Sequence, residues 1–209
     1  MSLDSLDILK NVSRETLDGL DRFVQLVAKW NPTINLVAKN SLADVWVRHI
    51  KDSAQLIPLA ATGRAWIDLG SGGGFPGIVV SVVLKEVAPE TCMYLVESDA
   101  RKATFLREAS RALRLNCQVV NQRIDEINLP PATVISARAL AHLDKLLHFS
   151  KRLVDLDGVC LFMKGKSHQD EVRLARESWK FDCEVIQSKT SAEAAVLRIR
   201  NIECAAKKT

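Results

Sequence analysis

The stretch from Trp66 to Gly77 places several glycines directly after a short apolar run. Its sequence, WIDLGSGGGFPG, carries Gly70, Gly72 and Gly74, and an apolar helical pattern follows it. Glycine is favoured where the chain turns tightly and where a ligand must contact backbone. A strand, a glycine loop and a helix in this order predict a cradle for a nucleotide-like cofactor.

Two acidic residues indicate which cofactor this loop would take. The GxGxxG pattern of residues 72–77 matches the dinucleotide fingerprint, and Glu97, at the end of the next apolar run (YLVE), suits ribose hydroxyls. The dinucleotide register, however, starts two residues too late, and Asp68 beside the loop would repel a pyrophosphate. The same carboxylate suits a ligand with an ammonium and a sulfonium. We therefore favour S-adenosylmethionine over a dinucleotide, with contacts at Asp68, Gly70, Gly72 and Glu97.

Other polar residues follow later strands of the same pattern. Asp125 and Glu126 (in NQRIDE) follow the third strand, where a carboxylate can accept a hydrogen bond from the adenine amine. Arg138 ends the fourth strand, and the carboxyl ends of parallel strands line the ligand crevice. Lys164 and Lys166 follow the fifth strand on the same rim and could contact phosphate.

A basic stripe marks the helix expected after Glu97. Arg107, Arg111 and Arg114 fall in one narrow sector, opposite an apolar face. The stripe is either a solvated helix face or a contact with RNA. Residues 1–62 hold as many acidic as basic side chains, so the whole net charge of +4 lies in residues 63–209. This location indicates an anionic partner without identifying it.

The elements that must position these residues alternate between strands and helices from residue 65 onward. This alternation predicts an α/β, Rossmann-like domain with a mostly parallel sheet. Two final strands with only a loop between them predict a C-terminal antiparallel hairpin. The expected strands span 65–69, 93–96, 118–120, 133–137, 159–163, 183–187 and 195–201, and the expected helices lie near 75–87, 99–115, 139–155 and 168–179.

Residues 1–62 are expected to form a helical extension packed on a catalytic domain of residues 63–209. Ser13 can cap a helix from Arg14 to Trp30, which Asn31-Pro32 should stop. A second helix is expected to start at Ser41.

The N-terminal segment also contains RHIKDS, residues 48–53. His49, Asp52 and Ser53 share one face of the expected helix. We interpret them as a buried hydrogen-bonded network that holds the helices to the catalytic domain, rather than as catalysts.

The composition argues against several other kinds of site. The five cysteines include no C-x-x-C pair and the four histidines have no metal-binding spacing, so we expect neither a metal nor a disulfide framework. No apolar run approaches the roughly 20 residues of a membrane span. The N-terminus carries acidic residues before any basic one, unlike a signal peptide. We expect a cytoplasmic monomer whose tail, Ala205–Thr209, is frayed.

Taken together, these motifs resemble the RsmG family, also called GidB, of bacterial methyltransferases that modify N7 of a guanine in 16S ribosomal RNA. The resemblance covers nearly the whole chain. It rests on WNxxINL, RHxxDS, DLGSGGGFPG, LVES followed by RKAxFL, SARAL and KG. The glycine loop alone would indicate only the methyltransferase fold, whereas the GFPG ending and the two N-terminal motifs are more specific.

The resemblance implies the class I S-adenosylmethionine-dependent methyltransferase fold and a partner that is 16S rRNA or the small ribosomal subunit. It also implies a ribose contact at Glu97. The further cofactor contacts that it implies are Gly70, Phe75, Ile124, Asp125 and Arg138.

The chemistry of that reaction explains why no acid–base pair stands out. Guanine N7 carries a lone pair and no proton, so its attack on a sulfonium methyl needs no general base. We therefore expect catalysis mainly from alignment of the reactants, with Arg138 as the candidate catalytic residue. Arg138, Lys164 and Arg123 are candidates to donate to guanine O6. A small-molecule methyltransferase and a non-catalytic ribosome-assembly factor that binds adenosylmethionine stay as alternatives.

Overall fold

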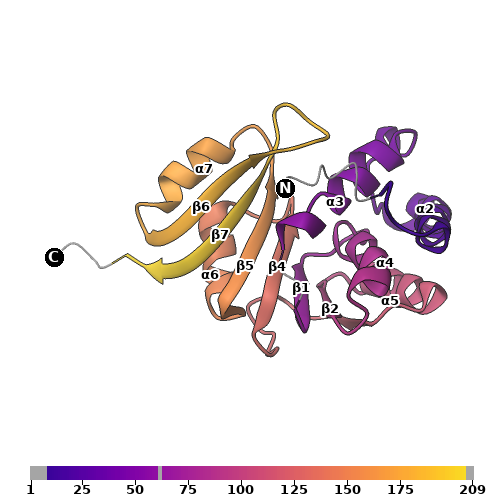
Figure 1. Cartoon of the computed structure of the whole chain (residues 1–209), viewed down its shortest axis with the longest axis horizontal. Helices are drawn as coiled ribbons and strands as arrows, with labels where there is room; N and C mark the ends of the chain where they lie inside the picture. The colour runs from indigo at the N-terminus through magenta and orange to yellow at the C-terminus, as the bar shows by residue number, and fades with distance from the viewer. Residues whose placement is uncertain (1–8, 61–62, 206–209) are drawn as a thin grey trace.

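The computed structural model describes residues 9–60 and 63–205 of the 209-residue chain, and within them it contains a seven-stranded sheet (Figure 1). The strand order is β3-β2-β1-β4-β5-β7-β6. The first five strands run parallel, and β7 is antiparallel to both β5 and β6. The mostly parallel sheet with a C-terminal antiparallel hairpin is therefore confirmed. The strands are β1 (Ala65–Leu69), β2 (Cys92–Val96), β3 (Cys117–Val120), β4 (Ala132–Arg138), β5 (Val154–Lys164), β6 (Trp179–Gln187) and β7 (Ala195–Cys204).

Helices cover both faces of this sheet (Figure 1). Trp66 of β1 points into the core on one face, whereas Ile67 and Leu69 point into the core on the other. The helices after the first strands are α4 (Gly77–Val87) and α5 (Ala100–Leu113), on the first face. The second face carries α6 (Leu143–Lys151) and α7 (His168–Ala175).

Two boundaries between helix and strand differ from the sequence prediction. The sequence predicts a helix to 179 and a strand from 183, whereas α7 ends at Ala175 and β6 begins at Trp179. The helix expected over 139–155 is α6 and ends at Lys151, and β5 begins at Val154 instead of near 159. Residues 155–157 are exposed and include two aspartates, so the start of β5 lacks the continuous apolar run that marks a buried strand.

The first helix, α2 (Arg14–Ile34), begins where the sequence predicts. The Ser13 hydroxyl oxygen accepts a hydrogen bond from the Thr16 N–H at 3.2 Å. The predicted end at Asn31-Pro32 is wrong. The helix continues to Ile34 because Pro32 falls in its last turn and the Asn31 carbonyl still accepts from the N–H of Asn35.

The segment after α2 is less regular than predicted. It forms the short 3-10 helix η1 (Lys39–Ser41), the π-helical turn η2 (Trp46–Lys51), the α-helical turn α3 (Asp52–Ala54) and η3 (Ile57–Leu59). A helix starting at Ser41 is therefore wrong. The Ser41 hydroxyl does not cap a following helix, because it donates backward to the Ala38 carbonyl at 2.7 Å.

The N-terminal helices pack on the first face of the sheet domain. Phe23 of α2 contacts the rings of Phe75 and Phe105, with centroids 5.1 and 6.3 Å away, and Trp30 lies 5.8 Å from Phe105. Residues 61–62, at the expected domain boundary, and 206–209, most of the expected frayed tail, lie outside the described residues. In the described ranges, no helix has both the length and the apolar content to cross a membrane.

Candidate functional site

The loop between β1 and α4 adopts a conformation that glycine favours. Gly70, Gly72 and Gly74 have φ angles of +68°, +53° and +84°. A Cβ at Gly70 would also lie 2.5 Å from a methyl carbon of Leu140. The predicted turn after β1 is thus built from glycines at the positions where other residues would be strained.

Asp68 supports this loop from beneath. Its side chain is fully buried, and its two carboxylate oxygens accept hydrogen bonds from the Ser136 hydroxyl at 2.7 Å and the Gly77 N–H at 3.1 Å. Burial raises the pKa of Asp68 to about 6, although both hydrogen bonds lower it. The structure thus places Asp68 beneath the glycine loop, which it fixes, and away from the wall of the adjoining cavity.

Glu97 ends β2 next to the same loop. One of its carboxylate oxygens accepts from the Gly72 N–H at 2.9 Å, and the other accepts from the Asp99 N–H at 2.8 Å. The residue is nine-tenths buried. Each oxygen retains a further lone pair, so the oriented carboxylate can still accept from a pair of hydroxyls.

A cavity of about 460 Å³, the first cavity, opens between the glycine loop and the ends of β2 and β4. Its volume lies in the range of about 300–1,000 Å³ that is typical of cofactor sites. Within residues 9–60 and 63–205, no cluster of three or more His, Cys, Asp or Glu side chains could hold a metal. The wall includes seven of the eight residues expected to contact the cofactor, namely Gly70, Gly72, Phe75, Glu97, Ile124, Asp125 and Arg138.

The rim of the first cavity near residues 122–125 is fixed by an arginine, Arg152, that no sequence motif marks. Arg152 donates to the carbonyl oxygens of Ile124 and Ile127, the latter at 2.7 Å. Asp125 is exposed, and Arg123 approaches its carboxylate at 3.3 Å. A hydrogen bond from its own backbone N–H and the Arg123 guanidinium lower the pKa of Asp125, so it is an ionised acceptor on this rim.

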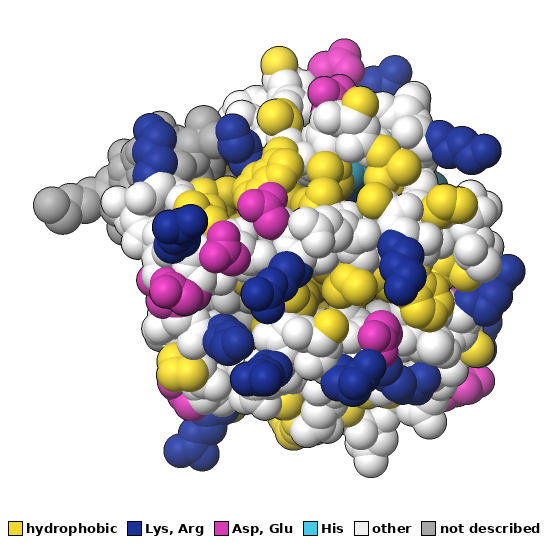
Figure 2. All heavy atoms as spheres, turned by 90° about the vertical axis from the view of Figure 1, so that its right-hand side faces the viewer, with side chains coloured by type: hydrophobic (Ala, Val, Ile, Leu, Met, Phe, Trp, Pro, Cys, Tyr) yellow, Lys and Arg dark blue, Asp and Glu magenta, His cyan; other side chains and the backbone are white. Residues whose placement is uncertain are grey.

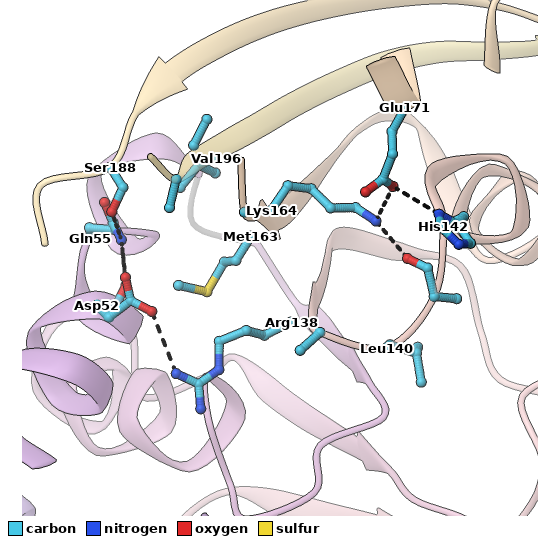
Figure 3. A pocket seen from close by; sticks show the side chains of 15 residues that line it. Asp52, Gln55, Arg138, Leu140, His142, Met163, Lys164, Glu171, Ser188 and Val196 are labelled. Carbon is cyan, nitrogen blue, oxygen red and sulfur yellow. Dashed lines mark hydrogen bonds and ion pairs between the residues drawn. The ribbon is translucent and has the colours of Figure 1, made fainter. Parts of the chain in front are cut away.

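A second cavity, of about 560 Å³ and drawn in Figure 3, adjoins the first. The two cavities share the turn Arg138–Ala141, in which Ala139 has a positive φ of 51°. Met163 and Val196 give the second cavity an apolar part, and Gln55 brings a polar group from the N-terminal segment. Gln55 could not be predicted from the sequence, because no motif distinguishes a single glutamine in a helical segment.

Lys164 lies in the wall of the second cavity and is already paired. Its ammonium lies 2.6 Å from a Glu171 carboxylate oxygen and 2.5 Å from the Ala141 carbonyl, and its side chain is only 8% exposed. In this structure Lys164 holds the Arg138–Ala141 turn and is not free to contact phosphate. Lys166 is exposed and lies outside the walls of both cavities.

Arg138 lies at the boundary of the two cavities, as expected for the carboxyl end of β4. Its Nη1 lies 3.0 Å from Nδ1 of His49 and 3.5 Å from an Asp52 carboxylate oxygen. The guanidinium carbon lies 5.2 Å from the centre of the Phe75 ring. Residues of the RHIKDS segment therefore join the N-terminal helices to β4. Ser53 does not take part directly, because its hydroxyl donates to the His49 carbonyl at 2.6 Å.

The basic stripe of α5 lies on the face formed by α2 and α5, outside both cavities. Arg107, Arg111 and Arg114 are all exposed. Arg111 is paired with Glu108 at 2.8 Å, and Arg114 ends the helix in a left-handed conformation. Figure 2 shows that Lys and Arg side chains are spread over this side of the molecule, with apolar and a few acidic side chains among them. The surface is consistent with both interpretations of the basic stripe, a solvated helix face or a contact with RNA.

Solved structures with the same fold include S-adenosylmethionine-dependent methyltransferases. One from Aquifex aeolicus superposes with a TM-score of 0.60 at 17% identity, over 75% of this chain and 92% of that one. A TehB-like methyltransferase from Corynebacterium glutamicum superposes with a TM-score of 0.58 at 13% identity, over 87% of this chain and 99% of that one. At these identities the likeness establishes the fold, and the Rossmann-like methyltransferase fold is confirmed.

Sequence comparison goes further than the fold. Proteins called ribosomal RNA small subunit methyltransferase G are 45% identical in Ruegeria pomeroyi, over 92% of this chain and 94% of that protein, and 46% identical in Parvibaculum lavamentivorans, over 95% and 89%. The model of the GidB family, described as rRNA small subunit methyltransferase G, matches residues 16–201. The resemblance drawn from the motifs is therefore confirmed, and the chain belongs to the GidB family of rRNA small subunit methyltransferase G.

Proposed function

We propose that this protein transfers the methyl group of S-adenosylmethionine to N7 of a guanine in 16S rRNA of the small ribosomal subunit. The observation that carries the proposal is the pair of adjoining cavities, one built on the glycine loop and Glu97 and the other open beside it, with Arg138 between them. Membership of the GidB family supports the same substrate class.

The first cavity fits the cofactor. Bound S-adenosylmethionine supplies a methyl group on a positively charged sulfur, which a lone pair can attack. Glu97, oriented by two backbone N–H groups, would accept from the ribose hydroxyls. Asp125, an ionised carboxylate on the rim, would accept from the adenine amine. Asp68 would contribute only by keeping the glycine loop in place.

The second cavity would take the guanine base. Its volume of about 560 Å³ accommodates a nucleotide that has been turned out of a folded RNA. Arg138 presents only hydrogen-bond donors, and the O6 and N7 edge of guanine presents only acceptors. Adenine would present an amine donor at the same edge. Arg138 therefore favours guanine over adenine when the N7 edge faces the first cavity.

The charges around the second cavity suit a product that becomes positively charged. Methylation at N7 moves a positive charge from sulfur to the guanine ring, so a donor at O6 orients the base rather than stabilising the new charge. The carboxylates of Asp52 and Glu171 lie in the wall, each already next to a cation. They keep the local charge near neutral, so the ring does not meet two unpaired cations.

No residue is needed to remove a proton from N7. His49 lies at the site, but burial and the guanidinium groups of Arg138 and Arg48 lower its pKa to about 4. We expect the single-turnover rate to be nearly constant from about pH 6.5 to 8.5, measured at saturating RNA and cofactor. Because a base with a pKa of about 4 would also give a flat profile in this range, the decisive variant is His49→Asn. If it folds and binds normally yet loses several orders of magnitude in rate, the mechanism without a general base is wrong.

We also propose that the enzyme acts in the cytoplasm as a monomer on rRNA or on the assembled small subunit. Exposed cations near the cavities and on α5, such as Arg123, Lys166 and Arg107, would contact RNA phosphates. These contacts would position the RNA, whereas the second cavity would select the base.

Methyl transfer from labelled cofactor tests the proposed function. The purified protein is incubated with radiolabelled adenosylmethionine and either small subunits, naked 16S rRNA or a metabolite extract, all from cells that lack the enzyme. We expect label in 16S rRNA, and chemical cleavage at N7-methylguanine should map it to one position. Label in metabolites would instead indicate a small-molecule enzyme. Cofactor binding without transfer to any of the three would indicate an assembly factor.

A further inference from the structure

A chain of hydrogen bonds runs from the N-terminal segment to the boundary of the two cavities. The Ser41 hydroxyl lies 2.7 Å from the Ala38 carbonyl and 2.9 Å from Nε2 of His49. On the other side of the imidazole ring, Nδ1 of His49 lies 3.0 Å from Nη1 of Arg138. This series of hydrogen bonds links Ala38 and Ser41 to Arg138 through the His49 ring.

The chemistry of the two ends fixes the proton positions along this chain. A guanidinium has donors only, so Nδ1 must carry a lone pair and accept from Arg138. The Ala38 carbonyl has acceptors only, so the Ser41 hydroxyl must donate to it. The Ser41 oxygen is then the acceptor for His49, and Nε2 must carry the hydrogen. Only the neutral Nε2–H tautomer satisfies every bond in the chain.

We propose that His49 is a positioning residue that holds the Arg138 guanidinium at the boundary of the two cavities as the neutral Nε2–H tautomer. The importance of Arg138 rests on the proposed function, whereas the tautomer and the hydrogen-bond chain do not. The contact with His49 is the shortest that Nη1 makes, since the Asp52 carboxylate and the Arg48 carbonyl lie 3.5 and 3.4 Å away.

Because Arg138 makes its hydrogen bonds to the protein through Nη1, its Nε and Nη2 can donate hydrogen bonds to ligands. In the part of the chain that the structure describes, every hydrogen bond of the Arg138 side chain is made through Nη1. The His49 ring also packs on Phe75, with centroids 4.9 Å apart, and Phe75 lies under Arg138. One histidine therefore fixes both the direction of the guanidinium and the ring beneath it.

The charges around His49 agree with a neutral ring. Arg48 lies on the same π-helical turn and Arg138 approaches from β4, while Asp52 of α3 faces Arg138 rather than the imidazole. Burial is the largest cause of the lowered His49 pKa, followed by the two arginines. A protonated ring would direct a donor at Arg138 and would release it.

Nitrogen NMR of histidine-labelled protein tests the tautomer without substrate or cofactor. At pH 7 we expect His49 to show a protonated Nε2 and an unprotonated Nδ1, and to keep this state down to about pH 5. Ser41→Ala removes the acceptor of Nε2–H but should keep this tautomer, because Nδ1 still accepts from Arg138. The double variant Ser41→Ala, Arg138→Ala removes both partners and should give a mixture of tautomers. An Nδ1–H tautomer or a cationic ring in the unaltered protein would overturn the proposal.

A comparison of two substitutions separates positioning from folding. His49→Asn keeps an acceptor close to the position of Nδ1, whereas His49→Leu fills the space without one. We expect His49→Leu to lower the methyl-transfer rate about tenfold or more, and His49→Asn to restore most of it, with thermal midpoints that match. Equal losses in the two variants would show that only ring packing matters.

A double-mutant cycle identifies Arg138 as the residue through which His49 acts. In an Arg138→Ala background, His49→Leu should have no further effect on the rate or on adenosylmethionine affinity by calorimetry. Additive losses would overturn the proposal. If no RNA is methylated by any variant, the proposed function fails, while the NMR result and the cycle in cofactor affinity still decide the role of His49.

Discussion

At the scale of single residues, the site depends on side chains whose own orientation is fixed by neighbours. Glu97 is held by two backbone N–H groups, and Arg138 is held by His49 and Asp52. Such fixed groups lose little conformational freedom when a ligand binds, so their hydrogen bonds contribute more to affinity than those of mobile side chains.

Glu97 should contribute measurably to cofactor affinity. Glu97→Ala leaves the ribose hydroxyls and the N–H groups of Gly72 and Asp99 without their acceptor. We expect adenosylmethionine binding to weaken by about 1–3 kcal/mol in calorimetry. Glu108→Ala, which removes an exposed carboxylate on α5, is the control and should bind normally. Unchanged affinity in Glu97→Ala would remove Glu97 from the cofactor site.

Asp68 should give folding stability a characteristic pH dependence. Its folded pKa of about 6 lies above the ordinary value of 3.8, so the folded state binds its proton more tightly than the unfolded chain. The cost of burying the charge is therefore present above pH 6 and disappears as pH falls towards 4. Relative to Asp68→Asn, the unaltered protein should gain up to about 3 kcal/mol between pH 7 and 4. Parallel stability curves from denaturant titrations of the two proteins would contradict this.

At the scale of elements, the strength of the local pattern decided what could be predicted. The strands β1 to β4 and the glycine loop were predicted to within one residue at each end, because buried parallel strands are short continuous apolar runs. The segment of residues 39–59 was not, since its π-helical and 3-10 turns have no period in the sequence. The hydrogen bond from the Gly77 N–H to Asp68 could not be predicted either. The sequence does not show whether a carboxylate beside a glycine loop faces a ligand or the backbone.

The junction of the loop and α4 should tolerate no side chain at Gly77. A Cβ there would overlap a Leu95 methyl and lie 2.6 Å from the Asp68 carboxylate oxygen that the Gly77 N–H contacts. Gly77→Ala should lower the free energy of unfolding by about 1–3 kcal/mol and weaken cofactor binding. Gly165→Ala is the matched control, because nothing lies within 4 Å of its added Cβ. Equal stability of the two variants by denaturant titration would show that the junction is not tightly packed.

At the scale of the whole molecule, the N-terminal segment completes a site that the sheet alone would leave open. Asp52 and Gln55 line the second cavity, and both bond to the β6–β7 loop, Asp52 through Thr190 at 2.6 Å and Gln55 through the Lys189 N–H at 3.0 Å. The motifs predicted that this segment belongs with the sheet domain. They could not predict that it reaches the far edge of the site, because that depends on contacts between residues more than 130 positions apart.

The basic face beyond the cavities should determine how salt affects RNA binding. The helix rise places Arg111 about 14 Å along α5 from Lys102, which lines the first cavity, so an RNA that enters the second cavity could also cross this face. Each arginine that neutralises a phosphate should contribute about 0.7 to 0.9 to the slope of log affinity against log salt. Arg111, already paired with Glu108, should contribute least.

Fluorescence titrations of labelled 16S rRNA fragments at several salt concentrations measure this slope. Arg107→Ala and Arg114→Ala should each reduce the magnitude of the slope by about 0.7 to 0.9, the contribution of one phosphate contact, and leave cofactor affinity unchanged. Arg111→Ala should reduce the slope less. Arg173→Ala is the control, because Arg173 is an exposed arginine on α7, which packs on the opposite face of the sheet. If the triple variant of the α5 arginines keeps the full slope, the stripe is a solvated helix face, and the RNA must approach the second cavity from the side of Arg123 and Lys166.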